Sequence, residues 1–242
     1  MNTKIYVIDN GFTNEGCIFY QMDPITFGLS KRGPILNENW TVNGLTSSGG
    51  NVYGWASKSG EKGISLLSIN TTTGKGTVTA TIGNNPVEAL TMDEHGIVYS
   101  IIKDESPSLK FTKFNPKSDE YTIIGSLFPS IKSVGALTFD SIGNLYALIN
   151  VKNNEAPNNN GTYLSSVNLS TGEVNIGGTG MKFLDNTHAK NINSMAYCGF
   201  KLYGGSGISN IYDIQGPLGI VSAMGQPNSL GSFLLNGMTS CI

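Results

Sequence analysis

The chain has 242 residues, a formal net charge of −2, and only 13% charged residues. This balance leaves no basic surplus to neutralise phosphates, which argues against nucleic acid as a partner. Thirty-one glycines and many Asn, Ser and Thr residues favour strands and turns over helices. No apolar run approaches the roughly 18 to 20 residues that cross a bilayer, so no membrane span is predicted.

The first residues, Met1 to Val7, contain neither the apolar stretch nor the cleavage site of a signal peptide. They favour a cytoplasmic origin. A secreted or cell-surface location stays open if a leader has been removed from the chain.

A tyrosine returns along the chain at a nearly fixed pitch. The five tyrosines are Tyr6, Tyr53, Tyr99, Tyr146 and Tyr203. Their spacings are 47, 46, 47 and 57 residues. A repeat of this length indicates stacked or radial units rather than one irregular domain.

Each unit contains four short runs in the same order. The first has a small residue, then Leu or Met, then Thr or Ala, as in Ala136-Leu137-Thr138. A tight turn and the tyrosine run follow. The third run alternates apolar and polar residues and leads to a turn such as Thr73-Gly74. The fourth run ends in glycine. Its expected copies span Val78 to Gly83, Tyr121 to Gly125, Val174 to Gly177 and Ile220 to Gly225.

Four antiparallel strands in about 40 to 50 residues are typical of a β-propeller blade. In chain order the expected units are 4–34, 43–83, 88–126, 135–178, 193–225 and 235–242. The first begins at a second strand and the last supplies a lone first strand. The sequence therefore predicts an all-β, five-bladed propeller in one domain over 1–242, whose C-terminal strand joins the three N-terminal strands and closes the ring.

The motif Leu-Thr-x-Asp-x-x-Gly-x-Leu/Val-Tyr, followed by Leu/Val-Asn-x-x-Thr-Gly, resembles the blades of bacterial repeat propellers of unassigned function. Val134 to Gly177 shows it best, and Leu90 to Gly125 is a partial copy. The size and blade count are also similar to those of tachylectin-like lectins, whose Trp-rich motifs this chain lacks. These resemblances imply an architecture. The likeness to lectins also implies sugar binding, but it assigns that role to no particular residue of this chain.

We name the top face of the predicted propeller as the side where first strands begin and second strands end. Two insertions, Val151 to Thr162 and Met181 to Asn191, account for the 57-residue spacing, and both belong to this face. Long loops on a rigid scaffold often carry function. Asn158, Asp185 and His188 are therefore candidate ligand-binding residues, and tolerated surface insertion is the alternative.

Two tryptophans belong to the first complete unit. Trp40 enters a first strand from the top face, and Trp55 follows a tyrosine strand towards it. An exposed tryptophan stacks on sugars or anchors a protein partner. Packing between blades is the alternative for both, and we favour it for Trp55.

The residue before each small-Leu/Met pair should line the top of the central channel. The residues of this channel ring are Asn43, Glu88, Gly135, Asn193 and Asn236. Five-bladed glycosidases resembling arabinanases need two or three carboxylates at this mouth. The ring supplies one, Glu88, to which Asp185 or Glu105 would have to add a second from a loop.

Other chemistry has little support in the sequence. Cys17, Cys198 and Cys241 are not placed for a disulfide framework, which predicts buried free thiols. His95 and His188 are too few and too far apart for a histidine-based metal site. We expect no metal and no cofactor.

The leading hypothesis is a non-catalytic recognition module that binds a glycan or a protein surface through the top face. Trp40, Asn43, Glu88, Asn193, Asn236, Asn158, Asp185 and His188 are its candidate residues. One alternative is a glycoside hydrolase that uses Glu88. Another is an intracellular scaffold for protein interactions.

Overall fold

The computed structural model describes residues 4–10, 16–37, 39–104, 108–127, 131–151, 162–174, 181–182, 192–198, 201–206, 211–215, 220–225 and 235–241. Within these residues the regular structure consists of β-strands, which form five separate four-stranded antiparallel sheets. None of the described segments is a helix long and apolar enough to cross a lipid bilayer.

The strands of each sheet follow one another in the chain, apart from the sheet that combines both ends of the sequence. That sheet contains β20 (Leu235–Cys241), β1 (Lys4–Asp9), β2 (Ile18–Met22) and β3 (Leu29–Pro34). The next contains β4 (Trp40–Ser48), β5 (Asn51–Lys58), β6 (Ile64–Ile69) and β7 (Gly76–Gly83).

The remaining sheets have the same order. The third contains β8 (Val87–Met92), β9 (Val98–Ile102), β10 (Lys110–Asn115) and β11 (Glu120–Ser126). The fourth contains β12 (Ile131–Phe139), β13 (Leu145–Val151), β14 (Thr162–Val167) and β15 (Met181–Lys182). The fifth contains β16 (Ile192–Cys198), β17 (Lys201–Ser206), β18 (Ile211–Gln215) and β19 (Ile220–Gly225).

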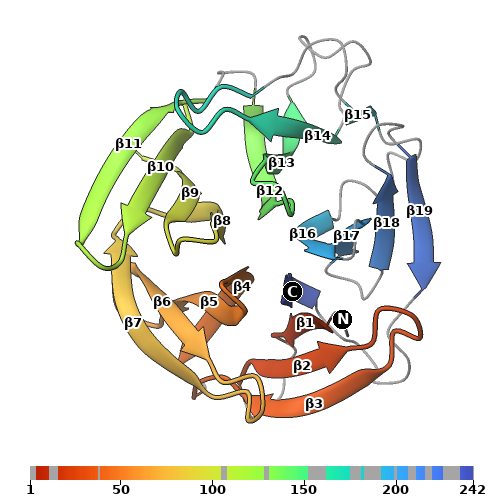
Figure 1. The fold of residues 1–242 in the computed structure, drawn as a ribbon. Helices are drawn as coiled ribbons and strands as arrows, with labels where there is room; N and C mark the ends of the chain where they lie inside the picture. The colour runs from red at the N-terminus through yellow and green to blue at the C-terminus, as the bar shows by residue number, and fades with distance from the viewer. Residues whose placement is uncertain are drawn as a thin grey trace.

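The sheets are arranged radially, with their first strands around a common centre and their fourth strands outside (Figure 1). The first strands contact one another in the cycle β4, β8, β12, β16, β20 and back to β4. The predicted pairing between the two ends of the chain is confirmed, because β20 pairs antiparallel with β1 from Lys4↔Cys241 to Asp9↔Leu235.

The hydrophobic core lies between the sheets and is divided into five clusters. Each cluster combines buried side chains from two neighbouring sheets. One links the first and second sheets through Phe19 and Leu67, which are both fully buried. Another links the third and fourth through Phe111 and Ile149, and the last returns from the fifth sheet to the first. Because burial of a large apolar side chain contributes roughly 1.5–3 kcal/mol, these contacts dominate the stability of the arrangement.

The repeating tyrosines occupy one register in all five sheets. Each is paired with the last residue of the small-Leu/Met-Thr/Ala run on the first strand. The pairs are Tyr6↔Thr239, Tyr53↔Thr46, Tyr99↔Thr91, Tyr146↔Thr138 and Tyr203↔Ala196. The spacing in the sequence therefore reports a repeated position in the sheet, although the insertions change the length of the fourth unit.

The fourth strand of one unit differs from the prediction. Val174 forms only an isolated bridge with Val167. The strand that pairs with β14 is β15, at Met181–Lys182, which the sequence analysis had assigned to a loop. The glycine-rich sequence Gly177-Gly178-Thr179-Gly180 has low strand propensity. The described partner of β14 lies beyond these glycines in the sequence.

Two motifs that the sequence treats separately meet at the interfaces between sheets. The glycine that ends a fourth strand lies against the Thr-Gly turn of the next sheet. A Cβ on Gly33 would lie 2.5 Å from the Thr73 carbonyl oxygen, and one on Gly125 would overlap the Thr171 carbonyl oxygen. The glycines therefore allow the backbones of neighbouring sheets to approach each other closely.

Replacement of Gly125 by alanine is expected to destabilise the protein. The added methyl group would collide with backbone, which cannot rotate away as a flexible side chain can, and overpacking of this kind costs about 1–3 kcal/mol. Urea unfolding measures the loss, with Ser126→Ala as the control because Ser126 is exposed on the same strand. Equal stability of the two variants would contradict the proposed close contact.

Cys17 is buried between the first and second sheets. Cys17 and Cys198 are free, buried thiols as predicted, whereas the Cys241 side chain lies outside the described part of the chain. Burial raises the pKa of the Cys17 thiol strongly above its ordinary value of 9.0, and the nearby Asp9 carboxylate adds to the increase. The protein therefore holds this thiol in its protonated form.

The stability of the protein is expected to fall above about pH 9. The folded state retains the Cys17 proton where the unfolded chain releases it, so the stabilisation is complete below pH 9 and is lost as the pH rises. One proton contributes a slope of at most about 1.4 kcal/mol per pH unit. Urea unfolding between pH 8 and pH 10 should show a shallower decline for Cys17→Ala than for wild type. Parallel curves would exclude Cys17 as the cause.

Candidate functional site

Each first strand contains a β-bulge at the same position, and the five bulged residues are those of the predicted channel ring. In β4 the pairing steps from Val42↔Ala56 to Gly44↔Trp55, which leaves Asn43 as the extra residue. The equivalent steps in β8, β12, β16 and β20 leave out Glu88, Gly135, Asn193 and Asn236. A bulge re-aims the side chain of its extra residue. The repeat thus supplies five special positions around the channel.

The structure brings Asn43, Glu88, Gly135 and Asn193 together around one small cavity. The cavity has a volume of about 40 Å³. Asn43 and Glu88 are partly buried, and Asn193 is exposed. This volume suits about one water molecule and is too small for a sugar ring. The upper end of the channel therefore has a polar lining but is too small to be a ligand pocket.

Hydrogen bonds fix two of the ring side chains. Glu88 Oε2 accepts the backbone N–H of Val134 in the neighbouring sheet at 3.0 Å. Asn43 Nδ2 donates to Ser57 Oγ at 3.3 Å. Glu88 is also the sole ionisable residue among the described residues that line the cavity. Its carboxylate thus connects two sheets, and the described lining holds no second carboxylate of the kind that glycoside hydrolysis requires.

The two tryptophans have different environments. Trp55 is 7% exposed and packs in the core between the second and third sheets. A Cβ on the paired Gly44 would collide with its indole ring. Trp40 is partly buried, packs at the edge of another intersheet cluster, and has the Lys58 ammonium 5.9 Å from its ring centroid. Trp55 therefore fills space between sheets, while Trp40 combines packing with partial exposure beside the top face.

Several predicted residues cannot be placed. Asn158, Asp185, His188 and Glu105 lie outside the described residues. Asn236 belongs to β20, but its side chain is not described. The part played by both long insertions therefore stays a prediction.

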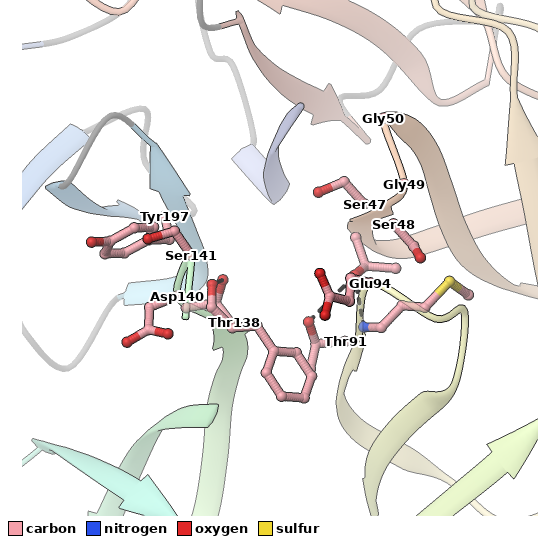
Figure 2. Close-up of a pocket in the computed structure, with 13 residues that line it drawn as sticks. Ser47, Ser48, Gly49, Gly50, Thr91, Glu94, Thr138, Asp140, Ser141 and Tyr197 are labelled. Atoms are coloured by element: carbon pink, nitrogen blue, oxygen red, sulfur yellow. Dashed lines mark hydrogen bonds between the residues drawn. The ribbon is translucent and has the colours of Figure 1, made fainter. Parts of the chain in front are cut away.

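A larger pocket, which the sequence analysis missed, lies at the opposite end of the channel. It has a volume of about 350 Å³ and is formed where β4, β8, β12 and β16 end and lead into their hairpins. Its polar residues include Thr46, Thr91, Thr138 and Glu94. Figure 2 shows Glu94 and Thr91 on one side of the pocket and Thr138 and Tyr197 on the other. The sequence signal was the recurring threonine of the first strand, which a β-sheet scaffold also explains.

The hairpins beside this pocket use aspartate to fix their own backbone. Asp93 Oδ1 accepts the N–H groups of His95 and Ile97 at 2.9 Å each. Asp140 Oδ1 accepts those of Ile142 and Asn144 at 3.0 and 2.8 Å. The described residues contain no group of three or more His, Cys, Asp or Glu side chains suited to a metal ion.

No protein-family model and no curated protein matches the sequence. The structure is similar to a chain of the crystallised nidogen/laminin complex, with a TM-score of 0.61, 10% identity, and coverage of 99% of this chain and 98% of that one. It also resembles TolB from Acinetobacter baumannii, with a TM-score of 0.53, 8% identity, and coverage of 94% and 53%.

A third similar structure is a protein of unknown function from Bacteroides thetaiotaomicron, with a TM-score of 0.50, 15% identity, and coverage of 91% and 58%. This chain therefore spans little more than half of the latter two proteins. At such low identities the comparisons show the fold alone, which is all-β and propeller-like.

Removal of the Glu88 side chain is expected to weaken the contact between the third and fourth sheets. Glu88→Ala leaves the Val134 N–H without its acceptor, which costs about 1–3 kcal/mol if the group remains dry. Glu88→Gln keeps an acceptor oxygen and should lose less than half as much. Urea unfolding of the two variants tests the contact, and equal losses would show that the hydrogen bond contributes nothing measurable.

Proposed function

We propose that the chain is a five-bladed β-propeller, one domain over residues 1–242, that acts as a non-catalytic recognition module. Its top face binds a glycan or a protein surface. Five four-stranded sheets and five intersheet clusters support the blade count. Four of the five bulged residues line one cavity, and this supports the choice of this face.

The observation that carries the proposal is the single carboxylate among the described residues of the upper cavity. An acid and a base or nucleophile must flank a glycosidic bond during hydrolysis. Glu88 already accepts the Val134 N–H, and its described neighbours in the ring are two asparagines and a glycine. Amide groups donate and accept hydrogen bonds without transferring protons, which suits binding rather than catalysis.

A ligand of the top face would lie across the mouth of the channel. A cavity of about 40 Å³ holds water, so it forms a hydrated floor beneath a larger ligand. Trp40 provides a partly exposed aromatic surface beside this floor. The insertions containing Asn158, Asp185 and His188 would form the rest of the rim.

A protein partner and a glycan are both compatible with this surface. The nidogen/laminin complex supports the first, since a fold similar to this one occurs there in a protein–protein complex. The resemblance to lectin architecture supports the second. The hydrolase alternative, with Glu88 as one acid, requires a second carboxylate from residues outside the described part of the chain.

Glycan arrays probed with wild type, Trp40→Ala and Asn193→Ala test the proposal. Truncation of an aromatic anchor should cost about 2 kcal/mol, or roughly 30-fold in affinity. Asn193→Ala should weaken binding without affecting the fold, because Asn193 is exposed. Thr72→Ala, at the exposed turn between β6 and β7, is the control outside the proposed site. If no glycan binds to wild type, the glycan version is wrong and a protein partner remains.

Incubation with a panel of plant and bacterial polysaccharides tests the absence of catalysis. We expect no release of reducing ends by wild type. Release that is lost in Glu88→Gln, while the variant keeps its unfolding midpoint, would replace the recognition module with a hydrolase.

A further inference from the structure

The pocket at the lower mouth of the channel has the dimensions of a small-molecule site. Its volume of about 350 Å³ falls at the lower end of the range for ligand pockets, roughly 300–1,000 Å³. It is separated from the upper ring by about three residues of each first strand, or roughly 10 Å. Its residues therefore act independently of the proposed top-face site.

One wall of the pocket is held by hydrogen bonds between the second and third sheets. The Met92 N–H donates to Thr46 Oγ1 at 2.9 Å, and the hydroxyls of Thr46 and Thr91 lie 3.3 Å apart. Ser48 Oγ donates to the Asp93 carbonyl oxygen. These bonds use the buried hydroxyls of Thr46, Thr91 and Ser48 to fix the wall before any ligand arrives, which lowers the entropic cost of binding.

The turn that closes this wall leaves space beside the pocket. Gly49 and Gly50 both have positive φ, 53° and 79°, as a two-residue type I′ hairpin requires. Side chains added at either position would meet nothing within 4 Å. The rim is therefore open here, and the hairpin geometry explains why glycines form it.

The other wall comes from β12, its hairpin and β16. It contains the Thr138 hydroxyl, the exposed Ser141, and the aromatic rings of Phe139 and Tyr197. Phe139 is fixed by an edge contact with Tyr99, whose ring centroid lies 5.5 Å away. Hydroxyl groups and aromatic carbons thus share one concave surface (Figure 2).

The charge of the pocket restricts its ligand. Glu94 and Asp140 are both lining residues, and the described lining contains no Lys, Arg or His. Asp140 uses its oxygens within its own hairpin, where Oδ2 accepts the Asn144 amide at 2.8 Å and Oδ1 accepts backbone groups. Glu94 is 84% exposed and its Oε1 lies 3.6 Å from His95 Nε2. Two carboxylates without a lining cation disfavour phosphates and carboxylates.

We propose that this lower pocket binds one neutral hexose unit. The ring hydroxyls of such a ligand donate to Glu94 and exchange hydrogen bonds with the hydroxyls of Ser141 and Thr138 on the other wall. Its C–H face packs against the aromatic side chains, in the way that amphipathic ligands use aromatic rings. The volume of the pocket matches one sugar ring rather than an extended chain.

The test is a titration of the ¹⁵N-labelled full chain with glucose, galactose, mannose and N-acetylglucosamine, each followed by NMR. We expect saturable shifts with a Kd of about 1 mM for at least one of them. The shifts should gather in the hairpins at 48–51, 93–97 and 140–144. Glucuronate and galacturonate are the matched anionic probes and should bind at least fivefold more weakly than glucose and galactose.

Variants locate the site. Glu94→Gln and Ser141→Ala, both at exposed positions, should weaken hexose binding about three- to tenfold, whereas Thr72→Ala, at the exposed turn between β6 and β7, should leave it unchanged. Thr138→Val keeps the shape of the side chain and removes only its hydroxyl, so it should weaken binding similarly. No saturable shift up to about 50 mM, equal binding of the uronates, or an equal loss of binding in Thr72→Ala would each overturn the proposal. The lower pocket and the top face are tested with different variants. Failure of hexose binding at the lower pocket therefore leaves the top-face proposal intact.

Discussion

Burial of both faces of every sheet against its two neighbours is the constraint on which this structure depends. One repeat unit cannot bury its apolar faces by itself, and here each intersheet cluster draws on two sheets. The requirement explains the small residues at the contacts. Gly44 makes room for the indole ring of Trp55. Gly125 makes room for the Thr171 carbonyl oxygen of the next sheet. The central channel follows from the radial arrangement, because the first strands meet where the sheets converge (Figure 1).

The bulges separate the chemistry of the channel from the packing of the sheets. The extra residue in each first strand has no partner in the ladder, so its identity is not set by a cross-strand neighbour. Asparagine, glutamate and glycine all occupy this position without a change of register. The lower end has the opposite character, because Thr46, Thr91 and Met92 are tied together across sheets. The upper mouth therefore makes contacts of its own, such as the Glu88 carboxylate on the Val134 N–H, while the lower mouth is tied to the scaffold through its threonines.

The sequence predicted the sheets better than the sites. Repeated tyrosines and turn residues identified the strand order and the pairing of β20 with β1 because local propensity and pattern agree there. The fourth strand of one unit was misplaced, since a glycine-rich stretch hides where pairing resumes. The ring residues were found by their offset in the repeat. The hydrogen bond from the Val134 N–H to Glu88 was not predicted, because a contact between a side chain and distant backbone leaves no local pattern in the sequence. The lower pocket was missed for a similar reason: Thr138 reads equally well as a good strand former.

The pairing of β20 with β1 has a consequence for how the chain is made. Residues 4–9 emerge from the ribosome early, whereas their partner strand at 235–241 emerges near the end of this sequence. At typical translation rates of about 5–20 residues per second, the edge of β1 waits on the order of tens of seconds. During that time an unpaired strand edge is open to association with other chains. The sheet that joins both ends of the sequence is therefore the one whose strands are synthesised furthest apart in time.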